Sequence, residues 1–170
     1  YAVVGIYFYD PQIVDIAAPG VEITSTIPQY PAALWVDTAT FDVAYFGFPV
    51  ESVTNVAERN AMISGAADLL TASTSTPVLI VDDSFPLLAS ETPGRRTSAY
   101  ANALAAAGFT DVDVYDIEAH AGTRPSAATL AAHTVVWITG RMSYVNYSRG
   151  SLDSTDRGLI GTFLDGGGKL

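Results

Sequence analysis

Two adjacent carboxylates, Asp82 and Asp83, end a short apolar run and are followed by Ser84. Carboxylate oxygens are the ligands that Ca²⁺ and Mg²⁺ prefer in proteins, so these two acids could hold such an ion. A hydrolase or a carbohydrate-active domain could use the same strand-end acids. Adjacent strand residues point to opposite faces, however, so both acids reach one ion only where the strand frays. We favour the plainer interpretation, in which one acid caps the following loop and the other is solvated.

The pattern around these acids predicts the elements that must position them. The run 78–81 is typical of a central parallel strand that is buried on both faces. After this strand the sequence predicts a helix at 97–107 that Gly108 stops, a strand at 112–117 and a short helix capped by Ser126 that ends near residue 133. A third buried strand follows at 134–140, then a helix capped by Ser154 or Thr155 and ended by Gly166, and a fourth strand that begins at Lys169 and Leu170. This alternation predicts an α/β fold: a doubly wound, mainly parallel, flavodoxin-like sheet in three layers.

In such sheets the binding sites lie beyond the carboxyl ends of the strands. The residues expected there are Asp82, Asp83, Ser84, Glu118, His120, Thr139, Gly140, Arg141 and Ser143. The binding candidates chosen from them are Asp82, Asp83, Ser84, His120, Thr139 and Arg141. If a metal binds, its ligands are Asp82 and Asp83. His120 and His133 lack the spacing of paired metal ligands, which favours surface or capping roles.

The first half of the chain has a different pattern, with several predicted strands and one closing helix. Strands are predicted at residues 2–9, 21–27, 33–36 and 41–48, the last two joined as a hairpin through residues 37–40. Asn55 and Glu58 resemble a capping box, and the apolar face of the helix that follows is predicted to hold Val56, Ile63, Ala66, Leu69 and Leu70. Residues 71–76 form a polar linker. We place the domain boundary there, with residues 1–75 in one unit and 76–170 in the next.

Composition limits the partners. The formal net charge is -10, and residues 1–75 hold eight of the 18 acids but one of the eight bases, Arg59. Nucleic acid requires a cationic face, so we expect no nucleic-acid partner. The chain has no cysteine, which removes disulfides and thiol catalysis. No apolar run reaches the length of a membrane span. Both ends interrupt predicted elements, so we interpret the sequence as an excerpt of a longer protein.

Two known chemistries can be tested against the residues. Residues 78–84 (VLIVDDS) resemble the start of a response-regulator receiver domain, in which paired acids hold Mg²⁺. A receiver needs an acceptor aspartate at the end of its third strand, where this chain has Thr139. Glutamine amidotransferase activity needs a cysteine nucleophile, and the serine motif G-x-S-x-G is also missing. We therefore assign no catalytic residue, and the missing nucleophile favours no enzymatic activity for this segment.

Several segments of the second half form a recognisable pattern together: residues 78–84, 98–100, 103–104, 108, 114–116, 125–126, 134–140 and 156–170. This pattern resembles the glutamine-amidotransferase-like α/β module of secreted bacterial and archaeal proteins, such as immune-inhibitor-A-type and subtilisin-like peptidases. Residues 41–52, with Arg59, Leu69 and Leu70, resemble the last strand and helix of the same module. The chain then spans the tail of one copy and the head of the next.

This resemblance implies a function and a setting. It implies a non-catalytic accessory or structural module of a secreted, multidomain protein, at the cell surface or outside the cell. The parent could be a peptidase or an extracellular assembly. Expected partners are other domains of the same polypeptide, or further copies through self-assembly, and no cofactor is implied beyond the Ca²⁺ or Mg²⁺ considered above. The alternatives left open are a hydrolase or carbohydrate-active domain and a receiver-like metal-binding module.

Overall fold

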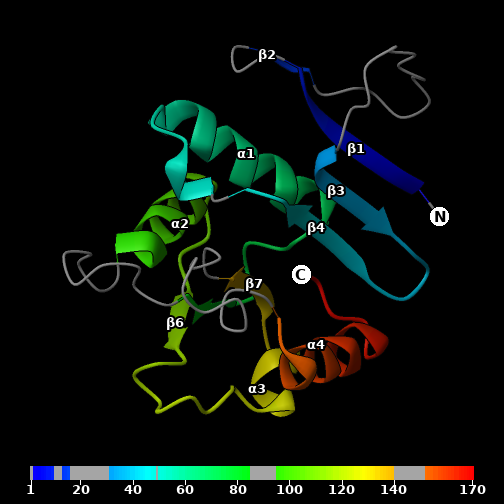
Figure 1. The fold of residues 1–170 in the computed structure, drawn as a ribbon, viewed down its shortest axis with the longest axis vertical. Coiled ribbons are helices and arrows are strands. Elements are labelled where there is room, and N and C mark those ends of the chain that lie inside the picture. Colours follow the sequence, from blue (N-terminus) through cyan, green and yellow to red (C-terminus); the bar gives the residue numbers. More distant parts are fainter. Residues whose placement is uncertain (1, 10–12, 16–30, 49, 85–94, 140–151) are drawn as a thin grey trace.

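The computed structural model describes residues 2–9, 13–15, 31–48, 50–84, 95–139 and 152–170, which fold into two sheets and four α-helices (Figure 1). The elements are β1 (Ala2–Tyr9), β2 (Ile13–Asp15), β3 (Pro31–Asp37), β4 (Asp42–Phe46), the 3-10 helix η1 (Val50–Ser52), α1 (Val56–Leu69), β5 (Val78–Asp83), α2 (Arg95–Ala106), β6 (Val112–Asp116), α3 (Ala127–Ala131), β7 (Thr134–Thr139) and α4 (Ser154–Asp165). The fold class is therefore α/β, as the sequence predicts.

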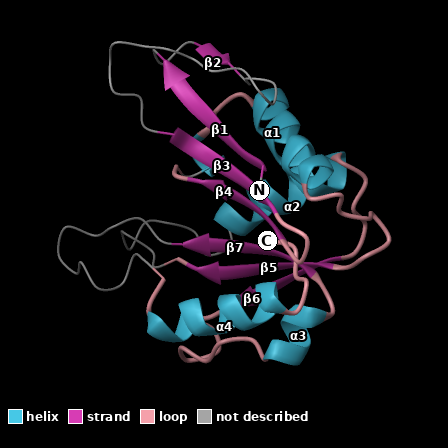
Figure 2. Cartoon of the chain, turned by 90° about the vertical axis from the view of Figure 1, so that its right-hand side faces the viewer, coloured by secondary structure: helices cyan, strands magenta, loops and turns pink. Residues whose placement is uncertain are grey.

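The second half builds a parallel sheet in the order β6-β5-β7. Its helices cover both faces, as Figure 2 shows. Side chains alternate along β5, so Val78 and Ile80 pack with α1 and α2, whereas Leu79 and Val81 pack with α3 and α4. This alternation accounts for the unbroken apolar run that the sequence shows in β5, because neither face of the strand reaches solvent.

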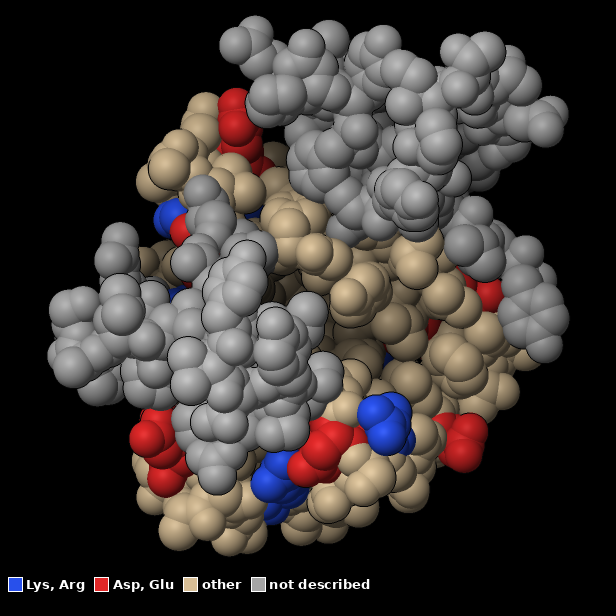
Figure 3. All heavy atoms as spheres, in the orientation of Figure 1, with Lys and Arg blue, Asp and Glu red and all other residues tan. Residues whose placement is uncertain are grey.

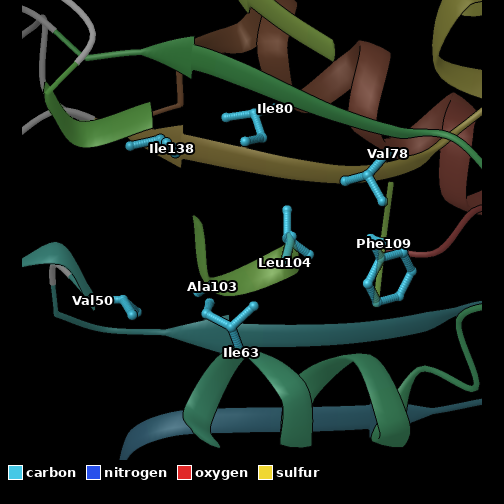
Figure 4. Close-up of a cluster of buried hydrophobic side chains, with 8 residues drawn as sticks. All are labelled: Val50, Ile63, Val78, Ile80, Ala103, Leu104, Phe109 and Ile138. Atoms are coloured by element: carbon cyan, nitrogen blue, oxygen red, sulfur yellow. The ribbon is translucent and has the colours of Figure 1, made fainter. Parts of the chain in front are cut away.

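One buried cluster draws on both halves of the chain (Figure 4). Val50 and Ile63 come from the first half, and they are 1% and 6% exposed. The other members come from β5, β7 and the α2 region: Val78, Ile80, Ala103, Leu104, Phe109 and Ile138. Burial of apolar area is the main stabilising term in folding, so the two halves stabilise each other through this cluster.

The first half forms an antiparallel sheet in the order β2-β1-β3-β4. The predicted hairpin is confirmed: Asp37 pairs with Asp42, and the Thr38 hydroxyl oxygen accepts the Phe41 amide at 2.9 Å. The description "mainly parallel" therefore fits β5, β6 and β7 but not the first four strands. The strand predicted at residues 21–27 lies outside the described residues.

Lys169 and Leu170 lie between the two sheets. On one side, the Val135 amide of β7 donates to the Lys169 carbonyl at 3.0 Å. On the other side, the Leu170 amide donates to the Asp42 carbonyl at 3.1 Å, and the Leu170 carbonyl accepts the Ala44 amide at 2.7 Å. The bridge to β4 is parallel. These two residues therefore connect β7 to β4. The division of the chain at residues 75 and 76 stays a prediction.

Polar contacts between the halves accompany this connection. The Lys169 ammonium donates to the Leu70 carbonyl at 2.6 Å and to the Thr71 hydroxyl at 2.6 Å. It thereby satisfies carbonyl groups at the C-terminal end of α1, where a cation is favoured by the helix dipole. In a second contact, the Tyr100 hydroxyl of α2 donates to the Glu51 carboxylate of η1 at 3.2 Å.

Most helix ends agree with the sequence signals. Asn55 caps α1, accepting from the Ala57 amide at 3.0 Å, and Ser126 caps α3. Gly108 follows α2 with φ +94, a conformation that glycine adopts without strain. The predicted cap of α4 is wrong: Asp153, rather than Ser154 or Thr155, is the N-cap. A carboxylate at this position accepts two amides and also interacts with the helix dipole.

The buried face of α1 differs in part from the predicted one. Ile63 and Leu70 are each 6% exposed, as expected, but Val56 is 56% and Leu69 is 39% exposed. Val56 and Leu69 are the first and last residues of α1. The core is therefore contacted by Ile63, in the middle of the helix, and by Leu70, which follows its last residue. Within the described residues, none of the helices combines the length and the apolar character that crossing a bilayer requires.

Candidate functional site

The carboxyl end of β5 separates its two acids. Because strand residues alternate, Asp82 lies on the α1 and α2 face and Asp83 on the α3 and α4 face. The Asp82 carboxylate accepts the Ser84 amide at 3.0 Å and also the Ser84 hydroxyl. The Asp83 carboxylate accepts the Trp137 indole N–H at 3.4 Å. Asp82 therefore caps its own loop, and the two acids are not arranged as a pair.

The pKa of the Asp83 carboxyl group lies well above its ordinary value. Burial raises the pKa of Asp83 to about 6, and the negative charge of Asp156 contributes in the same direction. The hydrogen bond from Trp137 and the positive charge of Arg124 oppose the rise, whereas Asp153 adds to it. Burial disfavours the charged form of an acid, and nearby acids do the same. Asp83 is therefore partly protonated near pH 6, which is a property that general acids also need.

Arg124 acts electrostatically on Asp83 and forms ion pairs with two acids at the start of α4. Its Nε atom lies 2.8 Å from Oδ1 of Asp156, which is 1% exposed, and its Nη2 atom lies 2.9 Å from Oδ2 of Asp153. Asp156 also accepts the Asp153 amide at 2.9 Å, which completes a capping box. Amide hydrogen bonds, first that of Asp156, hold the pKa of Asp153 below its usual range. The pKa of Arg124 is raised, chiefly by its hydrogen bond with Asp156.

The end of β6 is organised around Asp116. Its side chain accepts the amides of Glu118 and Ala119 at 2.8 and 3.1 Å, which fixes the turn after the strand. His120 is exposed, stacks on Tyr115 with 4.1 Å between ring centroids, and contacts the Asp116 carbonyl through Nδ1 at 2.7 Å. His120 thus lies on the surface of a turn, in agreement with the surface role expected for it.

The structure brings the predicted site residues together only in pairs. Thr139 is exposed at the end of β7. It pairs in register with Asp83 of β5, another predicted site residue. Ser84 serves Asp82. Arg141, with Gly140 and Ser143, lies outside the described residues.

Sequence reasoning missed the residues that surround Asp83. These are Arg124, Trp137, Asp153 and Asp156. One signal for two of them was present, because Asp153 and Asp156 have the spacing of a capping box just before the apolar positions of α4. Nothing in the sequence indicates that Arg124, 29 and 32 positions away, reaches both acids.

The chemistry available at this edge follows from these contacts. No group of three or more histidine, aspartate or glutamate side chains within the described residues is arranged to hold a metal ion. What the edge does present is a half-buried acid, an indole donor and an arginine that is shared by two carboxylates. Comparison with known proteins found no matching family model, no matching curated protein and no matching solved structure. The function must therefore be argued from the geometry.

Proposed function

We propose that this chain is a non-catalytic accessory or structural module of a secreted, multidomain protein, with other domains of that polypeptide as its partners. One observation carries the proposal: the acids at the carboxyl edge of the parallel sheet are used to build the fold. Asp82 binds Ser84, Asp116 fixes a turn, and Asp153 and Asp156 start α4 and hold Arg124. A carboxylate that already accepts several hydrogen bonds has less capacity to bind a metal ion or a substrate.

The finer fold assignment belongs to the same proposal. We infer a flavodoxin-like sheet, in which the strand order would be 2-1-3-4-5. The order β6-β5-β7 fits the first three positions, Lys169 and Leu170 fit the fourth, and β4 followed by α1 fits the fifth. The relation to glutamine-amidotransferase-like modules of secreted peptidases, and the extracellular setting, rest on the sequence resemblance described above.

A calorimetric titration with Ca²⁺ and with Mg²⁺ tests the proposal. The proteins are the wild type and the variant that combines Asp82→Asn with Asp83→Asn. We expect no saturable heat from either. Saturable binding to the wild type that the double variant loses would overturn the proposal and support a metal-binding module.

One observation favours a second candidate, a hydrolase or carbohydrate-active domain. The pKa of Asp83 near 6 suits an acid that gives and takes a proton close to neutral pH. Its test is a screen of glycoside and ester substrates with the wild type and Asp83→Asn. Turnover by the wild type that falls at least about a hundredfold in the variant would favour this candidate, since acid–base catalysis contributes on that order.

A further inference from the structure

The outer edge of the parallel sheet is formed by β6. In the order β6-β5-β7, β6 pairs only with β5 among the described strands, and β5 lies between it and β7 (Figure 2). In the strand order inferred above, 2-1-3-4-5, β6 takes the outer position beside β5. A strand in that position is the normal end of such a sheet, so this edge is a feature of the fold itself.

Alternate backbone groups of β6 point away from β5. The Val78 amide of β5 donates to the Asp111 carbonyl at 2.9 Å, and the Ile117 amide donates back to β5 at 3.0 Å. Odd-numbered residues along β6 therefore bond to β5, and even-numbered residues point to the other side. The amide and carbonyl groups of Val112 and Val114 thus lie on the outer edge, and no other described residue bonds to them there. These groups can pair with one further strand.

The side chains along this edge alternate between acidic and apolar. Asp111 and Asp113 are exposed, and the side chain of Asp113 is 71% exposed. Val112 packs against the core on the α2 face, whereas Val114, on the same face, is 49% exposed. Of residues 111–118, four are acids and none is lysine or arginine. The edge therefore presents acids on one face of the sheet and an exposed valine on the other.

The charge of this edge discriminates between possible partners. Two copies of the chain that paired through β6 would place two sets of these acids beside each other, and like charges across a strand pair are destabilising. A strand with basic side chains meets no such repulsion, and a chain of net charge -10 attracts cationic partners. The basic side chains visible in Figure 3 are isolated, so the face drawn there carries no basic patch that would repel such a strand.

We propose that the outer edge of β6 binds an extended segment of a partner domain in which basic and apolar residues alternate, and that this segment adds a strand to the sheet. Its basic side chains would lie beside Asp111 and Asp113, and its apolar ones beside Val114. A small cation would leave the amide and carbonyl groups of the edge unpaired. The inference rests on the proposed function, for which it names the class of partner. The metal titration above tests that function separately, so either can fail alone.

The test uses a fluorescently labelled peptide of alternating lysine and valine, about six residues long, which is the length of a typical strand. One control peptide has the same sequence with a methyl group on every backbone nitrogen, which keeps the charges and removes the donors. A second control has its lysines and valines in two blocks. We expect fluorescence anisotropy to show saturable binding of the first peptide, weakened by salt, and at least about tenfold weaker binding of both controls.

Three protein variants locate the binding. Asp111→Asn combined with Asp113→Asn removes two charges from the edge and should weaken binding about fivefold. The matched control combines Glu58→Gln with Asp68→Asn, which removes two charges from exposed positions of α1 and should change binding less than about twofold. Val114→Pro removes an amide that points away from β5, where proline is tolerated in an edge strand, and should weaken binding at least about tenfold.

Hydrogen exchange on the unaltered protein keeps the test decisive if Val114→Pro fails to fold. Bound peptide should slow exchange of the Val112 and Val114 amides. The proposal is wrong if the alternating peptide does not bind, if either control peptide binds equally well, or if these two amides exchange at an unchanged rate. It is also wrong if the α1 control variant weakens binding as much as the edge variant does, or if the chain forms a dimer that Val114→Pro abolishes.

Discussion

Replacing Asp83 with asparagine should stabilise the protein at neutral pH. The amide keeps an oxygen that can accept the Trp137 indole, so the change removes the charge and preserves the contact. In the folded state the pKa of Asp83 is about 6, compared with 3.8 for an ordinary aspartate. The folded state therefore holds its proton more tightly than the unfolded state does, and ionising Asp83 above pH 6 costs free energy of folding.

The magnitude follows from this shift of about two pKa units, each of which corresponds to about 1.4 kcal/mol. The full conversion would be about 3 kcal/mol, but Asp83 is only half-buried, and solvent screening reduces the figure to about 1–2 kcal/mol. The sign depends on pH. The cost is absent below about pH 4, where both states are protonated, grows between pH 4 and 6, and is complete above pH 6.

Urea unfolding followed by far-ultraviolet circular dichroism measures the effect. The free energy of unfolding of Asp83→Asn should exceed that of the wild type by about 1–2 kcal/mol at pH 7.5, and the difference should vanish near pH 4. Glu118→Gln, which removes one charge from an exposed side chain, is the control and should change stability by less than about 0.5 kcal/mol. A variant that is less stable than the wild type at pH 7.5, or a difference that does not depend on pH, would refute the reasoning.

Three further substitutions, two of them with a matched control variant, test other parts of the structure by urea unfolding. Asp153→Ala removes the cap of α4 and should cost about 1 kcal/mol, whereas Ser154→Ala should cost little; the reverse order would contradict the assigned cap. Arg124→Met leaves a buried carboxylate without its cation and should cost about 3 kcal/mol, so a neutral result would contradict the pairing. Gly108→Ala places a side chain at φ +94 and should cost about 1 kcal/mol. In contrast, Gly158→Ala places its methyl group in open space on α4 and should raise the free energy of unfolding by about 0.5–1 kcal/mol. Equal effects of Gly108→Ala and Gly158→Ala would contradict the positive φ of Gly108.

Local signals in the sequence predicted much of the fold. The apolar run of β5 predicted a strand buried on both faces, and Asn55, Ser126 and Gly108 predicted helix ends, because a cap or a left-handed residue acts over a few positions. The cap of α4 was misplaced because three consecutive residues, Asp153 to Thr155, can each serve as an N-cap. The residue that does so, Asp153, is the one that forms a capping box with Asp156.

Long-range contacts could not be predicted in the same way. The environment of Asp83 is made by residues from three other segments, and its pKa depends on their distances, which no local pattern encodes. The position of β4 beside Lys169 and Leu170 is likewise a contact between residues that lie far apart in the sequence, Asp42 and Lys169. Alternation within β5 did predict that Asp82 and Asp83 face opposite sides, because side-chain direction in a strand is a local property.

The central claim about the fold is that residues 1–75 and 76–170 share one hydrophobic core. The two tryptophans test it directly, because Trp35 lies in β3 and Trp137 in β7. In Trp137→Phe and Trp35→Phe, the remaining tryptophan reports urea unfolding of one half each, and far-ultraviolet circular dichroism reports the whole. Since Val50 and Ile63 are buried against β5 and α2, we predict that fluorescence and dichroism give one coincident transition in each variant. Separate transitions for the two halves would contradict the claim and support a domain boundary at residues 75 and 76.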